Sequence, residues 1–538
     1  MRQASFPREF DYIIVGGGSS GCVLANRLSA DPRNRVCLIE EGGGDNTPRI
    51  QVPAGTLTLY KSRKLAYQFF SVPQAGLDNR RIHVPRGRGL GGSSIMNSMI
   101  YIRGDRSDYD GWSAQGCAGW DYASVLKYFM KSEHDCLGLD PRFHGVAGEL
   151  DVTSPREANP LSRMFIEAAE QVGQTENPDF NGSTLDGVGI YNVTQRDGKR
   201  LSAYRAFVHP IRHRPNLHIV TGVTVKSLVI RQGRVKGVSV VHGGQCSALF
   251  AQRETVLSAG AIGSPAILMA SGIGRGDDLV EAGISVIHEL PGVGQNLQDH
   301  LDGLVTMRSD EARSLGFSWK SLPAVLSSPH QYALWRKGWL TTNYVEAGGF
   351  ARTKLADGAP DVQFHFVPGF RSHRGRLFEM GHGFAIHTCV LRPRSRGEIR
   401  PGRNGARDIQ IDFRFLHDPR DGEVLREGIR LARQIIRAPA FDGIRGREMA
   451  PGPEVVTDDE LMAYIRRSAS TVFHPAGTCR MGTDGDAVVT PDLKVRGMTG
   501  LRIADASIMP TLVSGNTNAP CIMIAEKAAD MILSDRRR

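Results

Sequence analysis

Two short segments near the carboxyl end of the chain carry residue types that could perform acid–base chemistry. The first holds His474, which lies between Phe473 and Pro475. The proline biases the residue before it toward an extended backbone, and an apolar cleft would keep the imidazole neutral and able to accept a proton near pH 7. The chain has 16 histidines, and a single histidine is more often structural than catalytic. His474 is therefore a candidate general base, with a structural role as the alternative.

The second segment is Gly515–Pro520, with the sequence GNTNAP. Asn518 offers both a donor and an acceptor just before Pro520, which suits the first turn of a helix that we predict over Pro520–Leu533. A helix N-terminus also stabilises negative charge on a neighbouring group. The alternative is that Asn518 is only a turn or cap residue.

These residues need a framework that holds the reacting molecules, and Phe10–Glu40 has the pattern of a dinucleotide-binding βαβ unit. Tyr12–Val15 is short, apolar and rich in β-branched residues, which predicts a strand buried on both faces. The next six residues, GGGSSG, match G-x-G-x-x-G. In such a motif Gly16 permits a tight turn, Gly18 lets the backbone approach a pyrophosphate, and Gly21 allows the helix to pack closely on the strand.

The rest of the unit is also present. Cys22–Ser29 predicts a helix whose first N–H groups would face a phosphate, and Val36–Ile39 predicts a second strand. Glu40 follows this strand nineteen residues after Gly21, where an acid can reach a ribose hydroxyl. A glycine motif alone is weak in a chain with 62 glycines, but the two strands, the helix and the acid together disfavour an ordinary glycine-rich turn.

Length and composition limit the class of protein. A chain of 538 residues exceeds one hydrophobic core, so we expect two large domains. Apolar and charged fractions of 41% and 23% describe an ordinary globular protein. No apolar run is long enough to span a bilayer, and the amino terminus lacks the apolar core of a signal peptide.

Cysteine spacing and charge limit the partners. None of the eight cysteines forms a C-x-x-C pair, so we expect reduced thiols, no metal site and a cytoplasmic protein. The net charge of +10 is spread along the chain without an aromatic-interleaved basic stripe, which disfavours nucleic acid as a partner. Peripheral attachment to the inner face of the cell membrane is left open.

The pattern of elements changes along the chain. Alternating strands, as in Val362–Val367 and Phe384–Leu391, and a helix near Asp421–Ile436 predict a second, mainly antiparallel domain. The last stretch, with a strand at Leu501–Ala504, returns to the nucleotide-binding pattern. We expect the first domain to comprise 1–160, 201–304 and 466–538, and the inserted second domain to comprise 161–200 and 305–465.

The βαβ unit, a glycine- and arginine-rich run over Pro85–Asn97, the Ser258–Gly274 run, His474 and the NTNAP segment occur together in this order. Over Phe10–Leu533 this combination resembles the glucose-methanol-choline (GMC) family of FAD-dependent oxidoreductases, nearest to bacterial alcohol dehydrogenases that use an acceptor other than oxygen and then to choline dehydrogenase. The resemblance implies an α/β fold, α+β overall, in which a Rossmann-like FAD-binding domain carries an inserted, mainly antiparallel-sheet substrate domain.

The resemblance also implies roles for single residues. His474 matches the catalytic histidine of the family, and Asn518 matches its second catalytic position. Met96 stands where some relatives bond the flavin to a histidine, so FAD should be non-covalent. The implied FAD contacts are Gly16, Gly18 and Gly21 at the pyrophosphate, Glu40 at the adenosine ribose, Val225 at the adenine, Gly92 and Asn97 at the flavin, Asp505 and Ala506 near the pyrophosphate and ribityl chain, and Asn516 and Thr517 at the pyrimidine edge.

The expected reaction is the oxidation of a primary aliphatic alcohol to an aldehyde. His474 would take the hydroxyl proton, Asn518 would hydrogen-bond the developing alkoxide, and the α-carbon would pass a hydride to flavin N5. Electrons would leave to an acceptor other than oxygen, either a quinone or an electron-transfer protein. The alternatives are a choline dehydrogenase, an oxidase that uses oxygen, an FAD-containing hydroxynitrile lyase or photodecarboxylase, and a pyridine-nucleotide enzyme.

Two further features bear on the substrate. Glu346 matches a position that helps to hold the choline cation in some relatives, with a hydrogen-bonded structural carboxylate as the equal alternative. Phe364, Phe366 and Phe370 could line a pocket for an apolar alcohol, but their spacing favours the core of a strand and its exit.

Overall fold

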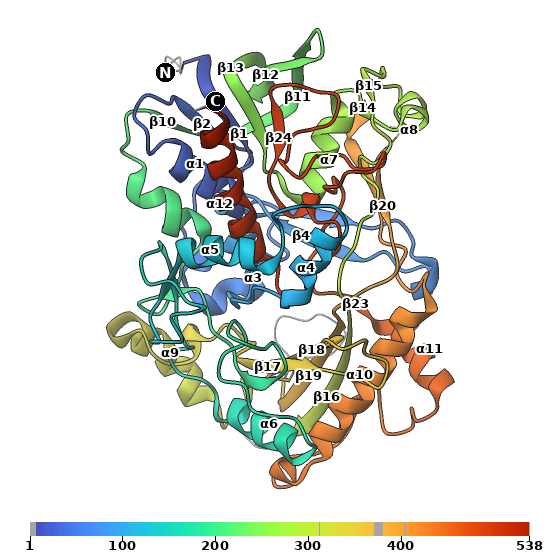
Figure 1. The fold of residues 1–538 in the computed structure, drawn as a ribbon. Helices are drawn as coiled ribbons and strands as arrows, with labels where there is room; N and C mark the ends of the chain where they lie inside the picture. Colours follow the sequence, from blue (N-terminus) through green and yellow to red (C-terminus); the bar gives the residue numbers. More distant parts are fainter. Residues whose placement is uncertain (1–6, 311–312, 371–379, 403–404, 537–538) are drawn as a thin grey trace.

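The chain folds around two seven-stranded sheets, one in each half of the molecule (Figure 1). This computed structural model describes residues 7–310, 313–370, 380–402 and 405–536. Both ends of the described chain lie in the upper half of the view in Figure 1, and the orange and yellow part of the chain builds the lower half.

The upper sheet has the mainly parallel order of a nucleotide-binding domain. Its strands run β10-β2-β1-β13-β12-β11, and β24 pairs with β13. The pairs among β10, β2, β1, β13 and β24 are parallel, whereas β11, β12 and β13 pair antiparallel. The bounds are β1 Glu9–Val15, β2 Val36–Glu40, β10 Leu217–Thr221, β11 Val223–Arg231, β12 Arg234–His242, β13 Gln245–Leu257 and β24 Leu501–Ile503.

Two helices from opposite ends of the chain meet beside this sheet. These are α1 (Ser19–Leu28) and α12 (Asn518–Asp535), which pack side by side (Figure 1). Their first residues are joined, since the Ser19 hydroxyl donates to Asn518 Oδ1 over 2.7 Å. Glu526 of α12 is fully buried and accepts from Arg27 of α1 at 2.6 Å. The two N-termini therefore converge, which concentrates partial positive charge at one place.

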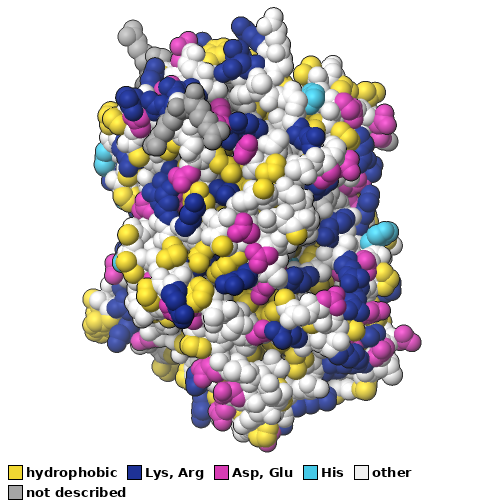
Figure 2. Space-filling model, viewed as in Figure 1, with side chains coloured by type: hydrophobic (Ala, Val, Ile, Leu, Met, Phe, Trp, Pro, Cys, Tyr) yellow, Lys and Arg dark blue, Asp and Glu magenta, His cyan; other side chains and the backbone are white. Residues whose placement is uncertain are grey.

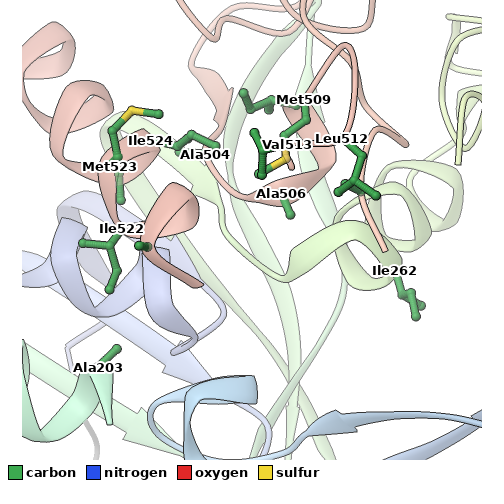
Figure 3. Close-up of a cluster of buried hydrophobic side chains, with 14 of the residues drawn as sticks. Ala203, Ile262, Ala504, Ala506, Met509, Leu512, Val513, Ile522, Met523 and Ile524 are labelled. Carbon is green, nitrogen blue, oxygen red and sulfur yellow. The ribbon is translucent and has the colours of Figure 1, made fainter. Parts of the chain in front are cut away.

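The carboxyl-terminal segment is fixed by an apolar cluster. Figure 3 shows side chains of α12 and of the stretch after β24 lying with residues of two other elements. One of these is α7 (Gly260–Ala270), which provides Ile262, and the other is η4 (Tyr204–Val208), preceded by Ala203. The labelled members from the carboxyl end are Ala504, Ala506, Met509, Leu512, Val513, Ile522, Met523 and Ile524, all of which are buried.

The lower sheet is antiparallel. Its order is β22-β16-β19-β18-β17-β7, and β23 pairs with β16. One face of this sheet is covered by α6 (Pro160–Gln171) and α10 (Pro419–Arg437) (Figure 1). The bounds are β7 Gly187–Ile190, β16 Leu301–Ser309, β17 Ala347–Ala351, β18 Val362–Val367, β19 His382–Val390, β22 Glu448–Ala450 and β23 Ser470–Thr471.

Strand alternation decides which side chains of β18 face the helices. Phe364 and Phe366 are fully buried, and the Phe366 ring stacks on Phe165 of α6 with centroids 4.9 Å apart. Their neighbours His365 and Val367 point to the other face and line a cavity. The two phenylalanines are thus core residues, whereas Phe370, beyond the end of the strand, does line the cavity.

The remaining elements lie outside the two seven-stranded sheets. The longest is α9 (Leu322–Trp335), and the hairpin β20 (Glu398–Gly402) and β21 (Gly405–Asp412) packs on α7 of the upper half. The others are α2 Pro48–Gln51, α3 Thr56–Leu59, β3 Ala66–Phe70, β4 His83–Gly87, α4 Arg106–Ala114, α5 Tyr122–Ser132, β5 Glu133–Asp135, β6 Leu150–Val152, β8 Gln195–Arg196, β9 Lys199–Arg200, β14 Ile273–Gly274, α8 Gly276–Glu281, β15 His288–Glu289 and α11 Asp458–Ser468, with short turns η1 Pro53–Gly55, η2 Ala75–Leu77, η3 Gly92–Ile95, η5 His209–Ile211, η6 Trp339–Thr341, η7 Pro439–Phe441 and η8 Ala506–Ile508.

The predicted fold class is confirmed, because a mixed helix and strand chain carries a nucleotide-binding sheet and an antiparallel sheet. The strand predicted at Val362–Val367 has those bounds. Helix α6 is capped by Asn159, whose Oδ1 accepts from Leu161 N at 2.9 Å. The domain ranges stay a prediction; β16 of the lower sheet starts at Leu301, just before the expected boundary at 304.

Figure 2 shows lysine and arginine interspersed with acidic side chains over the displayed face. Among the described residues, no helix is both long enough and apolar enough to cross a bilayer. All eight cysteines are free thiols.

Candidate active site

The glycines after β1 are required by close backbone contacts. Gly16 has a φ of +104°, and a Cβ there would lie 2.6 Å from the Ser258 carbonyl oxygen. A Cβ on Gly21 would lie 1.9 Å from the Gly16 carbonyl oxygen. Both positions are therefore closed to any side chain, as expected for the turn and the helix–strand contact of a dinucleotide motif.

Gly18 differs, because a Cβ there would make only ordinary van der Waals contacts, 3.8 Å from the Ser258 carbonyl oxygen and 3.9 Å from Gly92 Cα. Gly92 lies beside it, and a Cβ on Gly92 would be 2.6 Å from Gly18 Cα. Gly91 N also donates to Gly17 O at 2.7 Å. The two glycine-rich segments thus form one backbone surface at the start of α1, which fits the approach of a pyrophosphate.

Glu40 ends β2 beside this surface. Its Oε2 accepts from Gly17 N at 3.0 Å and its Oε1 from Gly42 N at 2.8 Å. Burial raises the pKa of Glu40, and these backbone donors oppose that shift. The carboxylate is therefore held at the turn, at the place predicted for a ribose contact.

Asp505 lies at the matching end of β24. Its Oδ2 accepts from Gly260 N at 2.8 Å and from the Ser264 hydroxyl at 2.6 Å, and burial raises its pKa. Ala506 follows in η8 and is buried, and its carbonyl accepts from Gly477 N at 3.1 Å. This ties the end of β24 to the segment after His474.

Val225 lies on β11, apart from these residues in the chain. It pairs with Val240 of β12, and the register shifts between Val225 and Ser227. Such a bulge interrupts the ladder locally and frees backbone groups. The adenine contact that the resemblance implies for Val225 stays a prediction.

Asn97 lines a large cavity and is held by Arg200, a residue that was not among the predicted site residues. Arg200 Nη1 donates to both the side-chain and the main-chain oxygen of Asn97, at 2.7 Å each. Arg200 is 3% exposed, donates also to Ile50 O and to the Thr56 hydroxyl, and forms no ion pair with a described carboxylate. Burial lowers its pKa to about 10. Arg200 follows Lys199 without a recognisable motif around it, so no pattern in the sequence indicated this role.

The cavity has a volume of about 1120 Å³ and lies between the two sheets. Its lower wall is the face of the antiparallel sheet that α6 and α10 leave uncovered. Its upper wall comes from the glycine-rich run and from both carboxyl-terminal segments. The lower wall includes Asp302, Leu304, His365, Val367 and His387, and the upper wall includes Ser19, Arg86, Ser93, Met96, Asn97, His474, Asn516, Thr517, Asn518 and Cys521.

Hydrogen bonds fix the tautomer of His474. His300 Nε2 lies 3.1 Å from the Leu391 carbonyl oxygen, which can only accept, so this nitrogen carries the proton. In neutral His300 the other nitrogen, Nδ1, must then accept, and it lies 3.0 Å from His474 Nδ1. His474 therefore donates from Nδ1 and keeps an unprotonated Nε2, which lies 3.3 Å from the Asn516 amide nitrogen.

The neutral state of these rings follows from their burial. Burial lowers the pKa of His300 to about 4 and that of His365 to about 3. Burial also places the pKa of His474 well below its usual range, and the nearby His300, His365 and Arg86 lower it further. At pH 7 the three imidazoles are uncharged, so His474 Nε2 can accept a proton.

Asp299 orients the backbone of both histidines. Its Oδ1 accepts from His474 N and from His300 N, each at 2.8 Å, and Thr471 donates to its other oxygen. Burial raises the pKa of Asp299 to about 7. The side chain of Arg86 lies close enough to lower that pKa again. Asp299 was not among the predicted residues, because two of its partners, Thr471 and His474, follow much later in the chain.

The two asparagines of the NTNAP segment occupy different places. Asn516 Nδ2 faces His474 Nε2, and its Oδ1 accepts from Gln363 Nε2 at 3.2 Å. Asn518 instead accepts from Ser19 at the junction of α1 and α12, as described above. Thr517, between them, is the N-cap residue of α12. The structure thus brings Asn516 into contact with His474, whereas Asn518, the predicted second catalytic residue, lies at the helix junction.

Glu346 does not line the cavity. It is 1% exposed, and its oxygens accept from the Thr342 hydroxyl at 2.6 Å, from Asn159 N at 2.6 Å and from the Ser162 hydroxyl at 3.1 Å. These three donors satisfy the carboxylate inside the protein. Glu346 is therefore a structural carboxylate that supports the start of α6.

Known proteins match this chain over most of its length. Models of the GMC oxidoreductase family match residues 10–302 and 393–525. The chain is 44% identical to an alcohol dehydrogenase [acceptor] of Pseudomonas putida over 97% of this chain and 96% of the relative, and 41% identical to an oxygen-dependent choline dehydrogenase of Chromohalobacter salexigens over 99% and 96%.

Solved structures agree. Pyridoxine 4-oxidase from Mesorbium loti aligns with a TM-score of 0.87 at 34% identity, covering 97% of this chain and 98% of that one. A formate oxidase aligns with a TM-score of 0.91 at 27% identity, covering 99% and 100%. Together with the close-packed glycines after β1 and the cavity between the sheets, these matches show that the chain belongs to the GMC oxidoreductase family and is an FAD-binding flavoprotein.

Proposed function

We propose that this protein oxidises a primary aliphatic alcohol to the aldehyde and passes the electrons to an acceptor other than oxygen. The observation that carries the proposal is the fixed tautomer of His474, whose unprotonated Nε2 lies beside Asn516 at the wall of the cavity. A neutral imidazole with a free lone pair is what the removal of a hydroxyl proton requires.

The residues present fit FAD at this site. Gly16, Gly18 and Gly21 would hold the pyrophosphate at the start of α1, with the remaining predicted contacts along the same path. When bound, FAD supplies the two-electron acceptor for the substrate. Met96 lines the cavity and cannot form the bond that a histidine forms, so we propose non-covalent FAD.

Two side chains would act on the substrate hydroxyl. His474 Nε2 would accept its proton, and the Asn516 amide, which now donates to that nitrogen, would donate to the developing alkoxide. General-base assistance of this kind contributes roughly 10²–10⁴ in rate. We therefore place Asn516, rather than Asn518, next to the reacting atoms, with Asn518 holding the start of α12.

The charges of the cavity favour a neutral substrate over choline. Asp302 is the one carboxylate among the described lining residues, and it is 2.8 Å from His387 Nδ1. Three basic residues, Arg49, Lys61 and Arg86, line the same cavity, and Glu346 is turned away from it. A quaternary ammonium would meet a net positive field. The apolar lining of Leu315, Phe317, Val325, Leu340, Val367 and Phe370 suits an alkyl chain.

Anaerobic mixing of the purified yellow protein with alcohols tests this proposal. We expect short and medium-chain primary alcohols to bleach the flavin absorbance and choline to do so only weakly. No bleaching with any alcohol would exclude a dehydrogenase and favour a lyase. Hydrogen peroxide released in air at the rate of dye reduction would instead show an oxidase.

A further inference from the structure

The helix α9 turns an unusually apolar face away from the protein. It contains no charged residue between Leu322 and Trp335. Leu326 is 70% exposed, Leu334 58% and Trp335 55%, and Trp319, just before the helix, is 86% exposed. Figure 1 places α9 at the left edge of the lower half, and Figure 2 shows hydrophobic atoms at that edge with lysine or arginine beside them. A cluster of this kind on one surface marks a contact site.

The other side of the same helix is a wall of the cavity. Val325 and Ser328 of α9 line it, as does Phe317 before the helix. The helix is anchored at its far end, where the Tyr332 hydroxyl donates to the Gly198 carbonyl at 3.1 Å. A single helix therefore separates the exposed apolar face from the cavity.

The segment that contains α9 carries basic residues and no acidic ones. From 313 to 345 the chain contains no aspartate or glutamate and four basic residues, Arg313, Lys320, Arg336 and Lys337. Three of the five tryptophans of the whole chain also lie in this segment. Two acids outside the segment accept hydrogen bonds from it: Glu157 from the backbone of Gly338 at 2.7 Å, and the buried Glu346 from the Thr342 hydroxyl at 2.6 Å. Basic residues around exposed tryptophan and leucine match the requirements of an anionic lipid surface.

We propose that the outer surface of Trp319–Lys337, called the α9 surface, docks on an anionic lipid bilayer. Tryptophan and leucine would enter the interfacial region while Lys320 and Lys337 contact lipid phosphates. A second copy of this chain fits less well, because a two-fold contact would bring the same cations against each other. The absence of acids disfavours an interface that pairs with itself.

If the α9 surface docks on a bilayer, the substrate would reach the cavity from the lipid. The cavity lies directly behind α9, so an alcohol with a long alkyl chain would be drawn from lipid rather than from water. This consequence rests on the proposed alcohol oxidation, whereas docking itself does not.

Vesicle flotation of the FAD-loaded protein tests the docking. We expect binding to phosphatidylcholine vesicles that contain phosphatidylglycerol, weaker binding to pure phosphatidylcholine, and loss with added salt. Joint Trp319→Ser and Leu326→Ser substitution should weaken binding at least tenfold. Removing a cation weakens such binding about fivefold, so joint Lys320→Glu and Lys337→Glu substitution should weaken it at least 25-fold.

Matched controls use exposed residues elsewhere. Val280 and Ile287 are 67% and 58% exposed, and Lys226 is also exposed; Val280→Ser with Ile287→Ser, and Lys226→Glu, should bind vesicles like the wild type. Oxidation of a short, water-soluble alcohol should be unchanged in every variant. A failure of the alcohol proposal would appear as absent flavin bleaching and would leave vesicle binding intact.

Three results would overturn the proposal. The first is no binding of the wild type to anionic vesicles, and the second is an equal loss in the control variants. The third is a wild-type dimer by light scattering that the Trp319→Ser and Leu326→Ser variant converts to a monomer, because that result would assign the surface to a second copy.

Discussion

His300 should control the rate through the tautomer of His474. Its Nδ1 accepts from His474 Nδ1 at 3.0 Å because its Nε2 is committed to Leu391. His300→Leu would leave a buried N–H of His474 without a partner, at a cost of about 1–3 kcal/mol. The ring could escape that cost by moving its proton to Nε2, which would remove the base.

The predicted loss in kcat/KM is therefore roughly 5- to 150-fold. Only its upper end reaches the lower end of the roughly 10²–10⁴ expected when the base itself is removed. His300→Gln keeps a carbonyl acceptor, and we expect it to retain more activity than His300→Leu. Anaerobic stopped-flow reduction with one alcohol would measure both, with flavin absorbance per protein showing that FAD is still bound.

A matched control is His365→Gln. It alters a neighbouring buried ring that lines the cavity but is not part of the hydrogen-bond chain Leu391–His300–His474. Equal losses in His300→Leu and His300→Gln, with FAD retained, would refute the tautomer argument. A loss below twofold in His300→Leu would refute it as well.

Three further predictions follow from the same contacts. Asn516→Ala should lower kcat/KM by about 10²-fold or more while Asn518→Ala lowers it less, and the reverse order would restore the role first predicted for Asn518. Because burial places the pKa of His474 well below 6.5, and only the neutral base reacts, kcat/KM should fall as the pH drops through that low pKa; an acidic limb centred above 6.5 would contradict this. Gly18→Ala should leave the apo fold intact, because a Cβ there makes only ordinary contacts at 3.8 Å or more, but it should weaken FAD binding, measured by flavin titration, because the added methyl group would keep the pyrophosphate from the backbone. Gly21→Ala should lower the thermal midpoint, since a Cβ there would be 1.9 Å from a carbonyl oxygen; equal thermal midpoints for the two variants would count against this reading of the cradle.

Local patterns in the sequence were enough to predict the nucleotide-binding framework. The strand before Gly16, the helix after it and the strand before Glu40 depend on neighbours in the chain, and the structure has all of them. The strand at Val362–Val367 was also predicted with its bounds, because alternation is a local property.

The details of the site depend on contacts that are distant in sequence. His300 is bound by residues 174 and 91 positions away, so nothing in its own segment marks it. Asn516 and Asn518 are two residues apart at a helix start, and spacing alone could not tell which of them faces His474. The role of Glu346 likewise required the position of α6.

The pairing of β24 with β13 and of α12 with α1 has a consequence for how the protein is made. A ribosome releases the amino-terminal glycine motif long before the Leu501–Asp535 segment that completes its sheet and helix layer. Asn516 lies within that late segment, and His474 lies shortly before it. A chain cut short by premature termination before Leu501 would therefore lack the strand and the helix that complete the cofactor domain, whether or not it already contained His474.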